Sequence, residues 1–120
     1  MSEFFLKKKA LILFTVFFFT TALQAQVSHT DSLTRLLNTP ADPLQKAGWL
    51  VQRSRSWPGA EMDRPMADAQ EALAIYQQIG AKKGQAEAYL QIAGLYSRQS
   101  KFQQALELDS MALRLAEEVQ

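Results

Sequence analysis

The stretch AEAYLQIAGLYSRQSKFQQALELDSMALRLAEEV, from Ala86 to Val119, decides the fold of this chain. Two apolar stripes recur in it at three- and four-residue intervals, with the polar turn RQSK between them, and this periodicity predicts two helices. Large side chains on one helix face small ones on the other, so the helices can approach closely. The stretch therefore predicts an antiparallel helical hairpin. Its contact residues are Tyr89, Ile92, Ala93, Tyr96, Phe102, Ala105, Leu106, Ala112 and Leu113.

This alternation resembles the tetratricopeptide repeat, a helical hairpin of about 34 residues with large and small apolar positions. The residues that match its signature are Tyr89, Ile92, Ala93, Tyr96, Phe102, Ala105 and Ala112. Ser100 stands where a turn glycine is usual, Asp109 where an aromatic or aliphatic is usual, and Glu117 where a helix-ending proline is usual. The resemblance implies an all-α protein whose antiparallel hairpins stack as a short tetratricopeptide-like α-solenoid; a plain helical bundle is the alternative.

A more degenerate hairpin is expected over residues 43–79, ahead of the hairpin over residues 80–120. Asp42 followed by proline is a strong helix-start signal, and the tripeptide WPG at 57–59 marks its end, which predicts a helix over 43–56. A second apolar stripe predicts a helix from about 64 to 79, which ends at Gly80 because glycine readily adopts the left-handed conformation of a helix end.

An internal alignment supports the earlier repeat. The string EALAIY matches MALRLA and puts Ala72 opposite Ala112, a spacing of 40 residues (112 − 72). At this spacing the first helix of the earlier hairpin matches poorly, since Gln52, Arg53 and Ser56 fall opposite Ile92, Ala93 and Tyr96.

The N-terminus has the layout of a secretory signal, here assigned to residues 1–25. Three lysines at 7–9 precede the apolar run ALILFTVFFFTTAL, which covers residues 10–23. This run is shorter than the roughly 18 residues that a membrane-spanning helix needs. We therefore expect cleavage after Ala25 and export to the periplasm or the medium, with a retained N-terminal anchor as the alternative.

Residues 26–42 are predicted to form a linker and one short helix. Residues 26–30 are expected to be a flexible start, and DSLTRLLN at 31–38 places leucines on one stripe, with Thr30 or Asp31 as the helix cap. The order of leader, short helix and repeats resembles the sensory regions of Bacteroidetes-type exported regulators. In those proteins a membrane helix and a signalling domain follow, so the chain fits either a truncated member or a free-standing module.

Composition excludes several classes of function. Without residues 1–25 the chain keeps 10 basic and 11 acidic residues, because three lysines and Glu3 are lost, and this balance argues against a nucleic-acid partner. The chain has no cysteine, so disulfides, thiolate metal sites and cysteine nucleophiles are excluded. His29 is the single histidine and lies in the expected flexible start, so we predict no catalytic residue, no metal site and no cofactor.

The remaining prediction is a surface for a partner. In the repeat family the first helix of each hairpin lines a concave groove, and the resemblance implies that Glu87, Leu90, Gly94, Ser97 and Arg98 share this face. Glycine within a helix costs about 1 kcal/mol relative to alanine, so Gly94 serves either a ligand backbone or close helix packing. We expect a non-catalytic scaffold that binds a protein or peptide, with no membrane contact after cleavage. The alternative is an assembly factor that self-associates through open solenoid ends.

Overall fold

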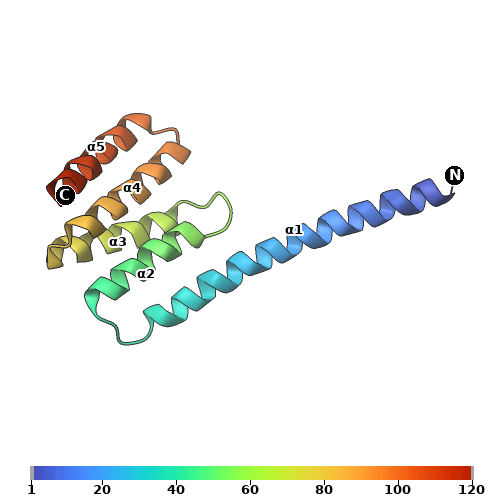
Figure 1. Ribbon diagram of the computed structural model, residues 1–120, viewed down its shortest axis with the longest axis horizontal. Helices are drawn as coiled ribbons and strands as arrows, with labels where there is room; N and C mark the ends of the chain where they lie inside the picture. Colours follow the sequence, from blue (N-terminus) through green and yellow to red (C-terminus); the bar gives the residue numbers. More distant parts are fainter. Residues whose placement is uncertain (1, 120) are drawn as a thin grey trace.

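The computed structural model describes the backbone of residues 2–119 and the side chains of residues 3–21, 24 and 29–119. All regular structure in this part of the chain is α-helical (Figure 1). Helix α2 packs with α3 and α4 packs with α5, while α3 joins the two hairpins through its contact with α4. This confirms the predicted all-α fold of stacked hairpins. The helices are α1 (Ser2–Leu37), α2 (Pro43–Ser56), α3 (Asp63–Ile79), α4 (Lys82–Arg98) and α5 (Phe102–Glu118).

Local signals fix most of the helix ends. The Asp42 carboxylate accepts a hydrogen bond from the Gln45 amide at 2.9 Å and caps α2. At the end of α3, Gly80 has a φ of 72°, the left-handed conformation that glycine adopts without strain. Ser100, which replaces the usual turn glycine, has a φ of 61°. Helix α4 begins at Lys82, two residues after Gly80.

Helix α1 differs most from the sequence prediction. Its backbone is helical without a break from Ser2 to Leu37, so the expectation of a flexible start at residues 26–30 is wrong. The physical reason is that no glycine or proline occurs before Pro40, so nothing interrupts the helix that the apolar run begins. The residues on either side of the predicted cleavage point after Ala25 have side chains outside the described part of the chain.

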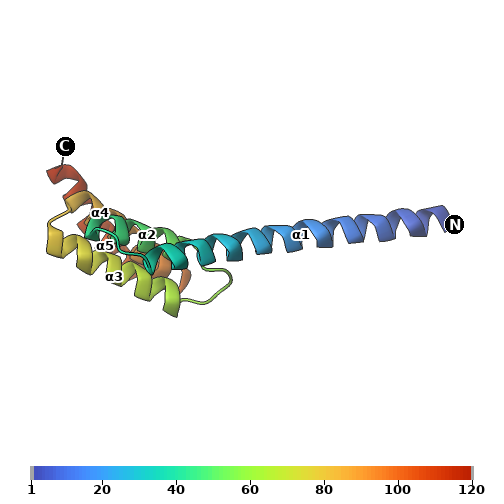
Figure 2. The ribbon, with the colours of Figure 1, turned by 90° about the horizontal axis from the view of Figure 1, so that it is seen from below.

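Among the described residues of α1, those of its last two turns pack on the hairpins. Leu33 is 3 % exposed against α2, and the Thr30 hydroxyl donates a hydrogen bond to the Ser56 carbonyl at 3.0 Å. Thr30 therefore bonds the end of α2 and does not cap a helix of its own, contrary to the prediction. The first half of α1 projects away from the bundle in both views (Figures 1 and 2). Its large apolar side chains between Phe4 and Phe19 are exposed.

The two hairpins share one packing pattern in two different registers. On α3, Pro65 and Ala72 are buried and lie 40 residues before the buried Ala105 and Ala112 of α5, as the alignment predicts. On α2, however, the buried Leu50 and Val51 lie 42 residues before Ile92 and Ala93 (92 − 50).

The single 40-residue period was therefore wrong for the first helix. It placed the exposed Gln52 and the half-buried Arg53 and Ser56 at core positions. The registers differ because the loop at 57–62 between α2 and α3 is longer than the connection at 99–101 between α4 and α5. Extra residues in a surface loop move the register without changing the packing.

A buried polar cluster holds this longer loop in place. Arg53 on α2 donates from Nε and a terminal nitrogen to the two carboxylate oxygens of Asp68 on α3, at 2.8 and 2.6 Å. The indole of Trp57 donates to the same carboxylate at 2.7 Å, and Arg53 also donates to Thr34 of α1 at 3.3 Å. Hydrogen bonds to Asp68 raise the pKa of the Arg53 guanidinium above its ordinary value. The cluster ties α1, α2, α3 and the loop together at one end of the first hairpin.

Candidate protein-binding groove

A groove runs between α2 and α4, the first helices of the two hairpins. It contains a hollow of about 230 Å³. Two of the predicted groove residues, Gly94 and Arg98, line this hollow, whereas Glu87, Leu90 and Ser97 lie exposed on α4 outside it. The complete lining consists of Ser54, Arg55, Gln91, Gly94, Leu95 and Arg98.

Gly94 forms an open part of the groove wall. A methyl group built on its backbone would meet no side chain and no neighbouring helix within 4 Å among the described residues. The helices therefore do not need glycine here for close packing, and that explanation of Gly94 is wrong. Gly84 in the same helix is the opposite case, because a methyl group there would overlap the ring of Tyr76. The space over Gly94 is accessible to a ligand.

The groove floor is polar and fully hydrogen-bonded. The Gln91 amide donates to the Ser54 hydroxyl at 3.0 Å, and this hydroxyl donates to the Pro65 carbonyl at 2.6 Å. Within the described part of the chain, no buried side-chain nitrogen or oxygen lacks a partner. A satisfied floor of this kind is rigid and does not need a ligand or a water to complete it.

Two arginines stand at the edges of the hollow. Arg98 donates to the Gly59 carbonyl at 3.1 Å, which fixes the guanidinium against the loop between α2 and α3, and Arg55 is exposed on α2. A guanidinium carries five N–H donors, so Arg98 keeps donors beyond this bond. The arrangement can donate hydrogen bonds to carbonyl or carboxylate oxygens of a bound chain.

Four lining residues were not predicted from the sequence: Ser54, Arg55, Gln91 and Leu95. With the 42-residue register Arg55 is the counterpart of Ser97, which was already assigned to the groove face. The 40-residue register hid this signal, since it placed three of the α4 groove positions opposite the buried Ala47, Leu50 and Ser54. A separate register for each helix would have predicted Arg55.

The signature residues of the second hairpin divide between core and surface. Tyr89, Ile92, Ala93, Ala105 and Ala112 are buried, and Tyr96 is half-buried. Phe102, Leu106 and Leu113 were expected to pack inside the hairpin, and this is wrong: all three point outward from α5 and are exposed. Their stripe lies on the side of α5 that none of the described helices covers, whereas α4 contacts Leu108, Met111 and Leu115.

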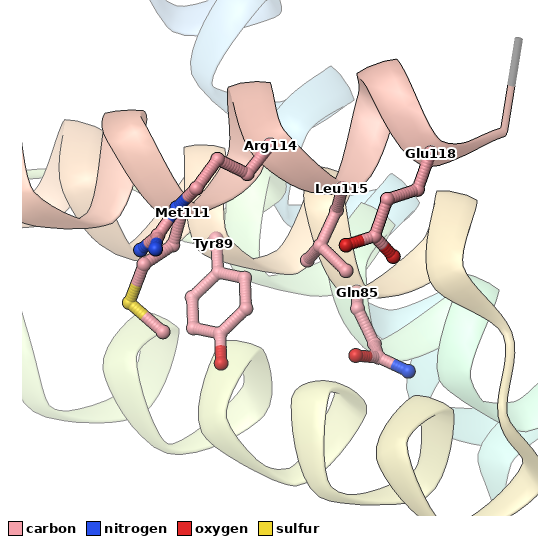
Figure 3. A pocket seen from close by; sticks show the side chains of 6 residues that line it. All are labelled: Gln85, Tyr89, Met111, Arg114, Leu115 and Glu118. Carbon is pink, nitrogen blue, oxygen red and sulfur yellow. The ribbon is translucent and has the colours of Figure 1, made fainter.

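A second hollow of about 220 Å³ lies between α4 and α5 (Figure 3). The hydroxyl of Tyr89 points out of it towards α3 and accepts a hydrogen bond from the Gln77 amide at 3.2 Å. At one end Glu118 forms an ion pair with Lys82 at 2.7 Å. The charged lining residues come from exposed helix surfaces and converge on no common point, so this hollow offers a weaker binding site than the groove. Its lining residues are Gln85, Tyr89, Met111, Arg114, Leu115 and Glu118.

The described residues contain no group of three or more His, Asp or Glu side chains that could hold a metal ion. Among the same residues, no helix combines the length and the apolar character needed to cross a membrane. His29 is exposed on α1.

Comparisons with known proteins add no further assignment. No protein-family model matches the sequence, and no curated protein and no solved structure matches the chain.

Proposed function

We propose that this chain is a non-catalytic, exported scaffold of the tetratricopeptide type that binds a protein or peptide partner in the groove between α2 and α4. The observation that carries the proposal is Gly94, a helical glycine over which a ligand backbone has free space. Glycine at an exposed helix position costs stability, so its presence is explained by a ligand that approaches the helix closely. The proposal assigns no catalytic group, cofactor or metal to the chain.

The groove is tested with peptides selected from a displayed random library against the purified protein. We expect selected peptides to lose at least tenfold in affinity for a variant carrying Arg55→Ala, Gln91→Ala and Arg98→Ala, because these changes remove hydrogen-bond donors that line the hollow. Gln78→Ala with Lys83→Ala on other exposed surfaces is the matched control. If every selected peptide binds the triple variant as well as the parent protein, the groove assignment fails.

Export rests on residues 1–25. The mature protein is expected to start at Gln26, which intact-mass measurement of the protein recovered from the periplasm or medium determines. Recovery of the chain with Met1 in a membrane fraction would instead indicate a retained anchor. The docked turns of α1 that contain Thr30 and Leu33 lie after the cleavage point and would remain in the mature protein.

The resemblance to exported regulators supports a role as the sensory fragment of a larger signal-transduction protein. Reading the gene beyond codon 120 tests this role, and an in-frame membrane helix with a signalling domain is the expected result.

The second candidate, a self-associating assembly factor, is favoured by the exposed apolar side chains of α5. Light scattering separates it from the scaffold, because an assembly factor forms a stable oligomer.

A further inference from the structure

The outer face of α5 is an apolar stripe that none of the described helices covers. Phe102, Leu106 and Leu113 follow one another at intervals of four and seven residues, so they lie on one side of the helix. They are 62, 61 and 61 % exposed. Contiguous apolar side chains at this exposure mark interaction surfaces more often than single exposed leucines do.

The protein itself shows what covers such a stripe. The residues 40 positions earlier are Met62, Met66 and Leu73, which are half-buried and pack against the core cluster that contains Ile92 and Leu95 of α4. The same stripe on α3 is thus covered by a helix that presents apolar residues at helical spacing. The stripe on α5 repeats this pattern, so it has the shape that accepts an amphipathic helix.

One residue of the stripe sets the chemistry of its partner. Asp109 lies between Leu106 and Leu113, and its counterpart 40 residues earlier is Ala69, which is 0 % exposed beneath α4. A helix laid over α5 would remove the Asp109 carboxylate from water. Burial of a carboxylate is unfavourable unless a cation or several donors replace its hydration. The covering helix must therefore place a lysine or arginine opposite Asp109.

A second copy of this chain meets that requirement less well than a helix with a basic residue. Asp109 lies near the middle of the stripe, so a two-fold contact between α5 helices would bring two carboxylates together, which is unfavourable. Head-to-tail stacking is hindered because the last turns of α1 occupy the free side of α2 through the buried Leu33. The stripe therefore fits a helix of a partner protein better than a second copy.

We propose that the outer face of α5 binds an amphipathic helix of a partner protein, with apolar side chains over Phe102, Leu106 and Leu113 and a basic side chain facing Asp109. This surface lies apart from the groove between α2 and α4. The binding site on α5 and the groove between α2 and α4 can therefore be tested independently of each other.

The probe is a synthetic peptide with the sequence of α4, Lys82–Arg98, since that helix covers the equivalent stripe. Two further peptides carry Ile92→Lys or Leu95→Lys, the two core positions that pack with Ala69. We expect one lysine peptide to bind the full chain at least about fivefold more tightly than the unmodified peptide in fluorescence anisotropy, as one partly buried charge pair allows. With the Asp109→Ala variant the order should reverse, because the unmodified peptide then meets an apolar stripe.

Leu106→Gln is expected to abolish peptide binding, whereas Leu44→Gln, at a leucine of α2 that is 57 % exposed, is the matched control and should leave it unchanged. Circular dichroism of each variant verifies that the helices are retained. The proposal is overturned if no peptide binds at millimolar concentration, or if Asp109→Ala leaves the order of the peptides unchanged. It is equally overturned if light scattering shows a dimer that Leu106→Gln dissociates, since the occupant is then a second copy.

Discussion

The two hairpins have similar helix packing but are stabilised by different chemistry. The first, α2 with α3, is enclosed by α1 on one side and α4 on the other, and the ion pair of Arg53 and Asp68 holds its long loop. The second, α4 with α5, closes through a three-residue connection, packs through tyrosines and alanines, and leaves one face of α5 open. Stacked hairpins can therefore form from different residues, provided that their packing surfaces are complementary in shape. The second hairpin has an uncovered face, so it is the one available to bind a partner.

The largest expected effect comes from breaking the polar cluster of the first hairpin. Asp68→Ala should lower the free energy of unfolding by about 3–5 kcal/mol, because it leaves the half-buried guanidinium of Arg53 without its carboxylate and the Trp57 indole without an acceptor. Urea denaturation measures the loss.

Glu71→Ala is the matched control for that variant. Its carboxylate pairs with Lys46 at 3.3 Å, but both side chains are about half exposed, so the loss should be about 0–1 kcal/mol. Equal losses in the two variants would mean that the buried cluster contributes no more than a surface ion pair, and the contrast between the hairpins would disappear.

The contact between the hairpins depends on Gly84 in the first turn of α4. Gly84→Ala should destabilise the protein by about 1–3 kcal/mol, because the added methyl group overlaps the ring of Tyr76, which is buried and cannot move aside freely. Thermal unfolding followed by circular dichroism is a suitable measurement. A variant as stable as the parent protein would show that α3 and α4 pack less closely here than the structure indicates.

Gly94 lies ten residues further along the same helix, and its substitution by alanine is expected to have the opposite effect on the free energy of unfolding. Gly94→Ala should raise the free energy of unfolding by up to about 1 kcal/mol, since alanine favours the helix and its methyl group meets no neighbour. The same variant should weaken peptides selected for the groove. Lower stability, or unchanged peptide affinity, would count against the open groove wall.

The predictable parts of this fold are those with local causes. The bounds of α2 follow from the proline after Asp42 and the WPG turn, and the end of α3 follows from Gly80. The pairing of Arg53 with Asp68 could not be predicted, because it spans a loop whose length also changed the register. The prediction of a flexible start at residues 26–30 was wrong because a short polar segment without glycine or proline continues the helix that precedes it.

The candidate site was predictable only in part, for the same reason. Gly94 and Arg98 could be assigned from one helix and its repeat pattern, whereas Arg55 required the correct register of another helix. The exposure of Phe102 could not be deduced either. An apolar stripe in a sequence does not show whether another helix covers it, because its exposure depends on which elements pack against α5 in the fold.

The smallest expected effect concerns the second hairpin at the far end of α5. A hydrogen bond from Lys82 and the charge of that ammonium group lower the pKa of the Glu118 carboxyl below its ordinary value. Because the pKa is lower in the folded state, the stabilisation is present above the unfolded-state pKa and is lost as the pH falls through the folded-state pKa.

Lys82→Met should return the pKa of Glu118 towards its ordinary value in an NMR titration of the side-chain carboxyl. High salt should do the same in the parent protein, because both groups are exposed and screened. An unchanged titration in Lys82→Met would show that this ion pair does not hold α4 and α5 together at this end, so that the described helices of the second hairpin would pack through their apolar contacts.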